Sequence, residues 1–425
     1  MAPRPLNILI CGGGIAGPAA AFWLSKLGHS CTIVERHGQL RAQGQQIDIR
    51  DQGISVVRRM GLLDEIRNRS VDEEGALFVD AVGKPVAFFG RTGDEEHQGF
   101  TSEFEIMRGE LCRILHEATR DRVAWRFEVT VDELEHVDDG RRVRAVFSDG
   151  EAAEYDLVIG ADGQGSRVRR NISPEDQYRA LGLFCCYFNM PRDADDKRKV
   201  FTMYVADKRR NIGTRWHSDK FGQGYLMTMS HADEMRRALR QADGDAQKDL
   251  FARVFRGAGW QADRLVHHMR QADDVYTFEA LQVTTQPWSK GRIVLLGDAG
   301  YAPSFCTGMG TTLAFVGAYV LAGELSRHGD DIPAALAAYD EELRPFVEKA
   351  QQLPPGFPSF AFPKSGWGVR LMNWILAIMV LIRFDAISAK LARLLPEGKK
   401  WKLPDYPALQ QGDVKEKGEK GSTRA

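Results

Sequence analysis

The sequence predicts an α/β fold, because one local pattern recurs in three widely separated segments. In residues 6–36, 156–170 and 288–325, an apolar run of strand length ends in a turn that contains glycine, and helical residues follow. Strands and helices that alternate in this way form parallel sheets, whose functional turns collect at the carboxyl edge. We therefore expect a parallel sheet with a ligand site at that edge.

The first segment contains a complete βαβ unit. An apolar run at residues 6–10 leads into a cluster of glycines, an alanine-rich helical stretch spans 18–27, and a second apolar run, 30–34, ends in Glu35. This order is typical of a Rossmann-like mononucleotide-binding unit.

Each glycine of this turn has a physical role. Gly12 permits the tight turn, Gly14 lets the backbone approach a pyrophosphate, and Gly17 lets the helix lie close to the sheet. The first helical turn then offers unpaired N–H groups and a positive dipole end to the phosphates, and Glu35 can accept hydrogen bonds from a ribose. These residues predict a bound dinucleotide, and a glycine-rich turn without ligand is the alternative.

The second and third segments each end in an aspartate beside a glycine. Asp162 and Gly163 follow the apolar strand at 157–159, where they allow a second backbone approach to the cofactor. Asp298 follows the strand at 293–296, where its carboxylate can hold the hydroxyl groups of an extended polyol. The helix that starts at residues 308–312 directs backbone N–H groups at whatever lies beyond it.

Length and composition indicate an ordinary globular protein and give no sign of a nucleic-acid-binding one. The chain has 425 residues, 43% hydrophobic and 27% charged, with a formal net charge of −1, which gives no reason to expect nucleic acid. The six cysteines show no metal-ligand spacing, so we expect no metal and a reducing, cytoplasmic location. The N-terminal apolar stretch runs straight into the glycine turn and is not a signal peptide.

The glycine motifs stop between residues 177 and 275, where we expect an inserted substrate-binding domain with helices on an antiparallel sheet. A hairpin at 77–80 and 86–89 is expected to donate strands to this second sheet. Two alternatives stay open for its large apolar side chains, which are core or the lining of a pocket; they are Phe188, Trp216, Tyr225, Met227 and Met229.

The predicted organisation has four parts. Residues 1–176 with 276–350 form a discontinuous cofactor-binding domain, 177–275 the substrate domain, 351–409 a C-terminal helical extension and 410–425 a disordered tail. The most apolar stretch, 369–382, is too short to span a membrane. It is expected to pack or to form a dimer, and contact with a membrane surface is the alternative.

The ordered trio of Gly12-x-Gly14-x-x-Gly17, Asp162-Gly163 and Gly297-Asp298 resembles class A flavoprotein monooxygenases of the p-hydroxybenzoate hydroxylase type. The sequences of residues 108–111 and 308–314 resemble most closely those of the tetracycline-inactivating monooxygenase branch. The resemblance covers about residues 6–345 and implies the fold of the glutathione reductase and p-hydroxybenzoate hydroxylase type, with FAD in the first site.

The resemblance also implies roles for residues around the adenosine end of FAD. Glu35 would hold the ribose and Arg36 would lie near the adenine. Asp48 and Arg108 match positions that contact FAD in the tetracycline-type branch, and Arg41 matches an arginine linked there to the nicotinamide cofactor.

At the reactive end, the resemblance places Asp162 and Gly163 near the pyrophosphate and Asp298 on the ribityl chain. The positions beside the flavin ring are Pro303, Gly308, Met309 and Gly310. No protein nucleophile is implied. Two departures lie next to the flavin: the common Gly-Asp-Ala-Ala-His reads Gly297-Asp298-Ala299-Gly300-Tyr301, and Met309 replaces a frequent glutamine.

The function implied by the resemblance is that of an FAD-dependent monooxygenase. NAD(P)H reduces the flavin, dioxygen forms a flavin 4a-hydroperoxide, and one oxygen atom enters an apolar polycyclic or aromatic small molecule by hydroxylation or epoxidation, in secondary metabolism. An oxidase, a Baeyer–Villiger monooxygenase or a halogenase on the same fold is the alternative; the halogenase stretch Trp-x-Trp-x-Ile-Pro is absent from the sequence. A nicotinamide dehydrogenase would leave Asp162-Gly163 and Gly297-Asp298 unexplained. A non-catalytic FAD protein is a further alternative, which the departures at Gly300-Tyr301 and Met309 keep open.

Overall fold

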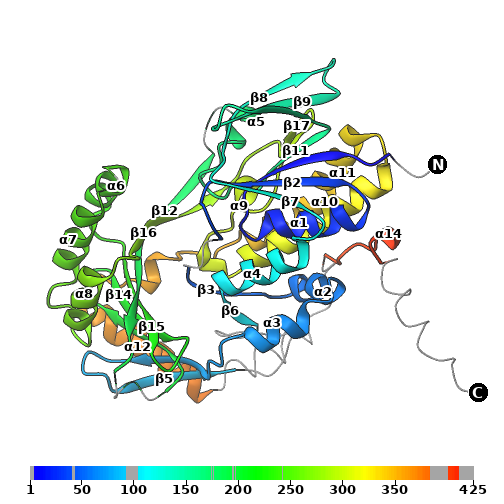
Figure 1. The fold of residues 1–425 in the computed structure, drawn as a ribbon. Helices are drawn as coiled ribbons and strands as arrows, with labels where there is room; N and C mark the ends of the chain where they lie inside the picture. Colours follow the sequence, from blue (N-terminus) through cyan, green and yellow to red (C-terminus); the bar gives the residue numbers. More distant parts are fainter. Residues whose placement is uncertain are drawn as a thin grey trace, which may run out of the picture.

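The computed structural model describes residues 4–40, 44–91, 104–173, 175, 177–193, 196, 198–241, 243–382 and 401–410. Two large sheets organise this part of the chain, one with six strands and one with seven (Figure 1). Two smaller sheets accompany them.

The six-stranded sheet is built from the predicted apolar runs. Neighbouring strands are parallel except at one edge, where the outermost strand runs antiparallel to its neighbour. Its strand order is β17 (Ser289–Lys290), β18 (Ile293–Leu295), β11 (Leu157–Gly160), β1 (Asn7–Cys11), β2 (Ser30–Glu35) and β7 (Ala124–Phe127). Because β1, β11 and β18 are parallel neighbours, the turns that follow them meet at one edge, and the α/β fold class is confirmed.

Both faces of this sheet are covered by other elements. The side chains of each strand alternate between the two faces and so contribute to both cores. Ile8 and Ile10 pack into the core on the helical face, whereas Leu9 and Cys11 pack on the opposite face. The opposite face is covered by an antiparallel sheet of β8 (Val131–Val137), β9 (Arg142–Phe147) and β10 (Ala152–Tyr155).

The helical layer centres on α10 (Gly310–His328), which packs against α1 (Ala16–Lys26), α2 (Gln52–Arg59) and α11 (Ile332–Ala350). Residues 311–325 of α10 are all buried, which explains its alanine-rich and apolar character on every side. The remaining helices of this region are α3 (Leu63–Arg69), α4 (Arg108–Thr119), α5 (Arg169–Ile172) and α9 (Asp298–Tyr301).

The seven-stranded sheet is assembled from three separate stretches of chain. Its order is β16 (Tyr276–Val283), β12 (Tyr178–Pro191), β15 (Phe221–Thr228), β14 (Arg210–Trp216), β13 (Phe201–Ala206), β4 (Gly75–Val79) and β5 (Pro85–Gly90). The prediction that the early hairpin joins this sheet is confirmed, because β4 pairs with β13. That pair is parallel, unlike the rest of the sheet. The sheet therefore reaches beyond residues 177–275 at both ends.

One face of the seven-stranded sheet is covered by α6 (Ala232–Gln241), α7 (Gly244–Phe255) and α8 (Ala262–Gln271). The other face is turned toward the six-stranded region. Between the two large sheets lies a two-stranded antiparallel sheet of β3 (Gln46–Asp48) and β6 (Glu105–Met107).

The C-terminal part contains α12 (Gly366–Leu381), which packs on β5, and α14 (Pro407–Gln410), which packs near α10. No helix of the described residues is both long and apolar enough to cross a bilayer. The predicted tail starts at Gln410, the last residue of α14, and its other residues, 411–425, lie outside the described residues.

Candidate active site

The first glycine turn leaves no room for side chains at two of its glycines. A Cβ at Gly17 would lie 2.1 Å from the carbonyl oxygen of Gly12. Gly12 has φ +116°, and its Cβ would lie 2.4 Å from the carbonyl oxygen of Ala161 in the second turn. The first two turns are therefore packed directly against each other at the carboxyl edge of the sheet.

Glu35 lies beside this turn, at the end of β2. Its carboxylate accepts hydrogen bonds from the backbone N–H groups of Gly13 at 2.8 Å and His37 at 3.1 Å. Arg36 is exposed and its Nε donates to Nε2 of His37 at 3.2 Å. Arg41 lies outside the described residues.

Arg108 brings a positive charge to the first turn. It is the first residue of α4, and a Cβ at Gly14 would lie 3.4 Å from one of its guanidinium nitrogens. The side chain is half-buried, and within the described chain its guanidinium has neither a hydrogen bond nor an ion pair. An unpaired cation beside a glycine turn suits a phosphate group, because phosphate can satisfy several donors at once.

Asp162 has a different role from the one its position alone suggests. Its carboxylate accepts hydrogen bonds from the Ser166 hydroxyl at 2.5 Å and from the backbone N–H groups of Arg167 at 2.7 Å and Val168 at 3.3 Å. These contacts hold the second turn in shape. Gly163, with φ +80°, faces open space where a Cβ would point.

Asp298, at the start of α9, is half-buried and has no hydrogen-bond partner among the described residues. Burial raises the pKa of its carboxyl, and the positive charge of Arg108 opposes that rise. In the described residues no group donates a hydrogen bond to this carboxylate. Its Oδ1 would lie 3.9 Å from a Cβ at Gly310. A Cβ at the preceding Gly297 would lie 3.0 Å from Cβ of Ala16, so the third turn lies against the first.

The loop from Pro303 to Gly310 connects α9 to α10 and contacts the seven-stranded sheet. The carbonyl of Pro303 accepts a hydrogen bond from Nε2 of Gln282, on β16, at 3.1 Å. Ser304 has φ +74° and is buried. Gly308 has φ +66°, and Met309 is the residue before the first turn of α10.

Asp48 lies close to this loop. Burial raises its pKa to about 6, the neighbouring Glu105 adds to the rise, and Arg50 opposes it. One of its oxygens accepts from Nη2 of Arg50 at 2.8 Å, and the other is buried with no partner among the described residues. A Cβ at Gly308 would lie 3.7 Å from Asp48 Oδ2. The Thr312 hydroxyl both donates to and accepts from the backbone of Arg50 at 2.9 Å, which fixes this segment against α10.

Sequence reasoning missed a buried charge network that joins the two regions. Arg215, on β14, donates to Glu73 at 2.7 and 2.9 Å and also to Glu105 of β6. Glu105 lies opposite Asp48 in the backbone register of the small antiparallel sheet. These groups are 110 and 142 residues apart from Arg215 in sequence, and no local pattern marks such distant pairs.

The open face of the seven-stranded sheet carries a continuous aromatic surface. The ring of Tyr187 contacts Tyr276, Phe278 and Tyr225 at centroid distances of 5.1, 5.8 and 6.1 Å. Phe278 contacts Phe305, in the Pro303–Gly310 loop, at 5.6 Å. A cavity of about 160 Å³ adjoins this surface, lined by Gly44, Tyr187, Phe188, Asn189, Gln223, Asp273, Asp274, Val275 and Tyr276.

The five apolar side chains singled out in the sequence divide between the two faces of this sheet. Tyr225, Met227 and Met229 lie on the open face, in a cluster with Cys306 of the loop. Trp216 and Phe188 belong to the core under α6–α8, although Phe188 also borders the cavity. Strand parity decides this, because neighbouring residues of a strand point to opposite faces.

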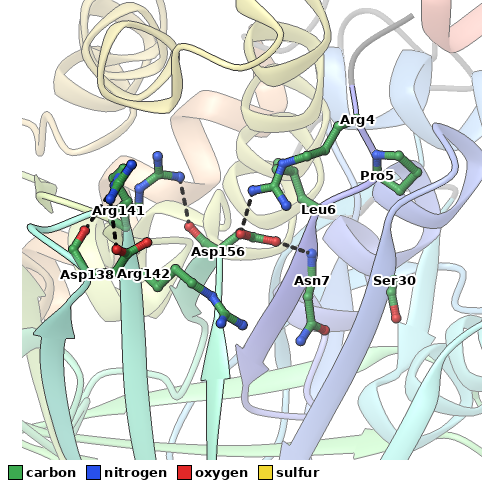
Figure 2. Close-up of a pocket in the computed structure, with 10 residues that line it drawn as sticks. Arg4, Pro5, Leu6, Asn7, Ser30, Asp138, Arg141, Arg142 and Asp156 are labelled. Atoms are coloured by element: carbon green, nitrogen blue, oxygen red, sulfur yellow. Dashed lines mark hydrogen bonds and ion pairs between the residues drawn. The ribbon is translucent and has the colours of Figure 1, made fainter.

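A larger cavity, about 600 Å³, lies at the opposite end of the six-stranded sheet and is separate from the glycine turns (Figure 2). Asp156 lies at its centre and accepts from Arg4 at 2.7 Å and from the backbone N–H of Asn7 at 2.8 Å. Burial opposes the change, but these hydrogen bonds lower the pKa of Asp156. Asn7 and Leu157 begin the strands whose other ends carry the turns, so this cavity lies away from the candidate site.

Three glycine turns meet at one sheet edge, beside an arginine side chain and a half-buried carboxylate that have no hydrogen-bond partner in the described chain. This arrangement fits a dinucleotide with hydroxyl groups between its phosphates and its ring. The fold and site thus define a dinucleotide-binding flavoprotein. The chain belongs to the FAD binding domain family, whose model matches residues 6–353. It is an FAD-dependent flavoprotein monooxygenase.

Curated relatives and solved structures agree with this class. The chain is 36% identical to "FAD-dependent monooxygenase asL4" of Sarocladium schorii, over 95% of this chain and 99% of that protein. It is 35% identical to "Monooxygenase CTB7" of Cercospora beticola, over 96% and 99%. The crystal structure of tetracycline destructase Tet(55) matches with a TM-score of 0.75 and 29% identity, over 96% of this chain and 100% of that one. The fold is also that of Klebsiella pneumoniae HpxO complexed with FAD, with a TM-score of 0.70 at 21% identity, over 91% and 98%.

Proposed function

We propose that this monooxygenase uses NAD(P)H and dioxygen to insert one oxygen atom, by hydroxylation or epoxidation, into an apolar polycyclic or aromatic small molecule in secondary metabolism. The observation that carries the proposal is the aromatic surface of Tyr187, Tyr276 and Phe278 that reaches Phe305 in the loop before α10. An apolar ring system lying on this surface would be next to the loop that the sequence assigns to the flavin edge. The name of the tetracycline destructase neighbours indicates a polycyclic substrate for those proteins.

We propose the following roles at the adenosine and phosphate end of FAD. The turn at Gly12–Gly17 leaves the backbone bare for the pyrophosphate, and Arg108 supplies a guanidinium that no described residue neutralises. Glu35 has two oxygens at the end of β2 for the ribose, each already oriented by a backbone N–H. Asp162 acts indirectly, since its carboxylate is used to hold the second turn.

Toward the ring, Asp298 is proposed to accept hydrogen bonds from the ribityl hydroxyls, because it is half-buried and has no protein donor in the described chain. Gly308 and Gly310 keep the start of α10 free of side chains, so that backbone N–H groups and the helix dipole can stabilise negative charge on the reduced ring. Bound FAD supplies the redox chemistry, taking a hydride from NAD(P)H and activating dioxygen. The protein supplies position and a site with little water, for which the apolar cluster of Met227, Phe278 and Cys306 is suited.

In this proposal residues 1–176 with 276–350 bind FAD and residues 177–275 supply most of the substrate wall. The early hairpin and β16 complete that wall from outside the segment.

The test is a product assay with purified holoenzyme. NADPH and NADH oxidation, oxygen uptake and product mass are measured over a panel of aromatic, polycyclic and polar aliphatic compounds. We expect substrate-dependent oxidation of one nicotinamide cofactor and a product heavier by one oxygen atom, with ¹⁸O from ¹⁸O₂. Hydrogen peroxide as the only oxygen product across the aromatic panel would indicate an oxidase, and incorporation of halide would indicate a halogenase; either would overturn the proposal.

A further inference from the structure

The helix α12 has one apolar face that is packed and a second that is not. The packed face contacts β5: Leu376 is buried with Ala87 and Phe89, and Met372 and Met379 pack around them. Figure 1 shows α12, in orange, beside β5 at the edge of the seven-stranded region. This contact fixes which side of the helix is turned outward.

The outer face of α12 is defined by seven large apolar side chains. Each is at least 45% exposed, and Trp374 and Leu381 reach 73% and 82%. The seven are Trp367, Leu371, Trp374, Ile375, Ile378, Leu381 and Ile382. Their spacing of three, four and seven residues places them in one stripe along the helix. A stripe of this size on a folded protein marks a contact with something apolar.

Within residues 364–384, the segment that carries the outer face, every charged residue is a cation. From residue 364 to residue 384 the charged residues in the sequence are Lys364, Arg370 and Arg383, and the first acid is Asp385. The turn at Lys208 and Arg209 lies against the start of this segment, where the N–H of Lys208 donates to the Lys364 carbonyl at 3.2 Å. Within the described chain, Lys208, Lys364 and Arg370 form no ion pair.

We propose that the outer face of α12 docks on the surface of an anionic lipid bilayer. Tryptophan and aliphatic side chains enter the interfacial layer, and the flanking cations meet the lipid headgroups. The 16-residue helix is only about 24 Å long at 1.5 Å per residue, which suits a helix lying in the surface rather than crossing it. A second copy of the chain fits less well, because a symmetric contact between two such segments would bring like charges near each other. The inference does not depend on the reaction proposed above.

The experiment measures binding of the FAD-loaded protein to sedimenting vesicles. Vesicles of phosphatidylcholine with 30% phosphatidylserine are compared with pure phosphatidylcholine, at low and high salt. We expect binding to the anionic vesicles that falls at high salt, with a blue shift of tryptophan emission. Leu381→Glu should weaken binding at least tenfold, because it places an acid in the most exposed position of the stripe.

The matched control is Phe221→Glu, which puts the same acid on an exposed apolar residue of β15 outside the helix. It should change binding less than twofold. Flavin absorbance and the thermal midpoint verify that both variants are folded. Equal binding by wild type and Leu381→Glu, or an equal loss in the control, would overturn the proposal. So would a wild-type dimer, seen by light scattering, that Leu381→Glu converts to monomer while the wild type fails to bind vesicles.

Discussion

The two large sheets contribute to the site in different ways. At the six-stranded sheet the backbone of the glycine turns forms the surface of the site. Side chains do not fit there, because a Cβ at Gly12 or Gly17 would collide with a carbonyl oxygen. At the seven-stranded sheet the side chains form the surface, and Tyr187, Tyr276 and Phe278 stand out from the strands toward the loop. A surface made by backbone tolerates few sequences, whereas a surface made by side chains can be changed residue by residue without altering the fold.

The largest effect is expected from adding one methyl group to the backbone surface. Gly17→Ala places a Cβ 2.1 Å from the Gly12 carbonyl, so the turn or helix α1 must shift. We expect loss of bound FAD, and a fall in the free energy of unfolding of about 1–3 kcal/mol or more. Flavin absorbance and denaturant unfolding measure both.

The control for that change is Gly244→Ala at the start of α7. Its Cβ meets nothing within 4 Å and its φ is not positive, so stability and flavin content should stay as in the wild type. A Gly17→Ala protein that purifies fully yellow would show that the backbone surface is less restrictive than the comparison requires.

A second effect concerns the boundary between the two sheets, where Asp48 is held. Burial raises its folded pKa to about 6, above the ordinary value of 3.8. As pH rises from about 4 to 6 the unfolded chain loses this proton before the folded one does, so the contribution of Asp48 to stability falls. The loss is on the order of 2–3 kcal/mol for the apoprotein.

Asp48→Asn removes that ionisation and should make the apoprotein more stable than the wild type at pH 7 but not at pH 4. Urea unfolding of both proteins at the two pH values gives the difference. An unchanged difference between pH 4 and pH 7 would contradict the predicted direction of the pKa shift.

A third prediction distinguishes the roles of two aspartates, Asp162 and Asp298, which both lie beside a glycine after an apolar strand. Asp298→Ala removes a carboxylate with no protein donor in the described chain, so it should weaken FAD about tenfold or more while apoprotein stability does not fall. Asp162→Ala removes three hydrogen bonds that hold the second turn. It should lower apoprotein stability by about 0.5–2 kcal/mol, as loss of a capping residue does. FAD titration of the apoproteins and urea unfolding distinguish the two, and an equal loss of stability in both variants would refute the separation.

The smallest effect is expected on the side-chain surface. Phe278→Leu removes an aromatic contact to Phe305 on the open face, and should raise KM for an aromatic substrate about threefold to fivefold with flavin content unchanged. Phe184→Leu is the same change on the adjacent strand, under the helices. It should lower stability by about 1–2 kcal/mol and leave KM unchanged. Steady-state kinetics and thermal unfolding test the pair. A KM change in Phe184→Leu but not in Phe278→Leu would show that the substrate does not lie on the open face.

The sequence was most informative where the backbone determines the site. Strand, glycine turn and helix follow one another locally at Gly12–Gly17, so both the parallel sheet and the cofactor class could be predicted. The early hairpin was also recognised as a donor of strands to a second sheet, and its pairing with β13 agrees.

The sequence was least informative where distant side chains meet. The pairing of Arg215 with Glu73 and Glu105 leaves no local pattern. Trp216 and Met227 are both large and apolar, yet strand parity places them on opposite faces. The engagement of Asp162 by its own turn, and the absence of a protein partner for Asp298, became visible only with the geometry.

The course of the chain through the two large sheets has a consequence for building chimeric enzymes. Residues 75–90, 178–228 and 276–283 all contribute strands to the seven-stranded sheet, and the cofactor strands lie before, between and after them. A single contiguous graft would therefore replace only part of the substrate wall and sever strand pairs such as β4 with β13. A working recombinant needs at least two blocks inherited from one parent, residues 75–90 and 178–283, together with Glu73 and Glu105 so that Arg215 keeps its counterions.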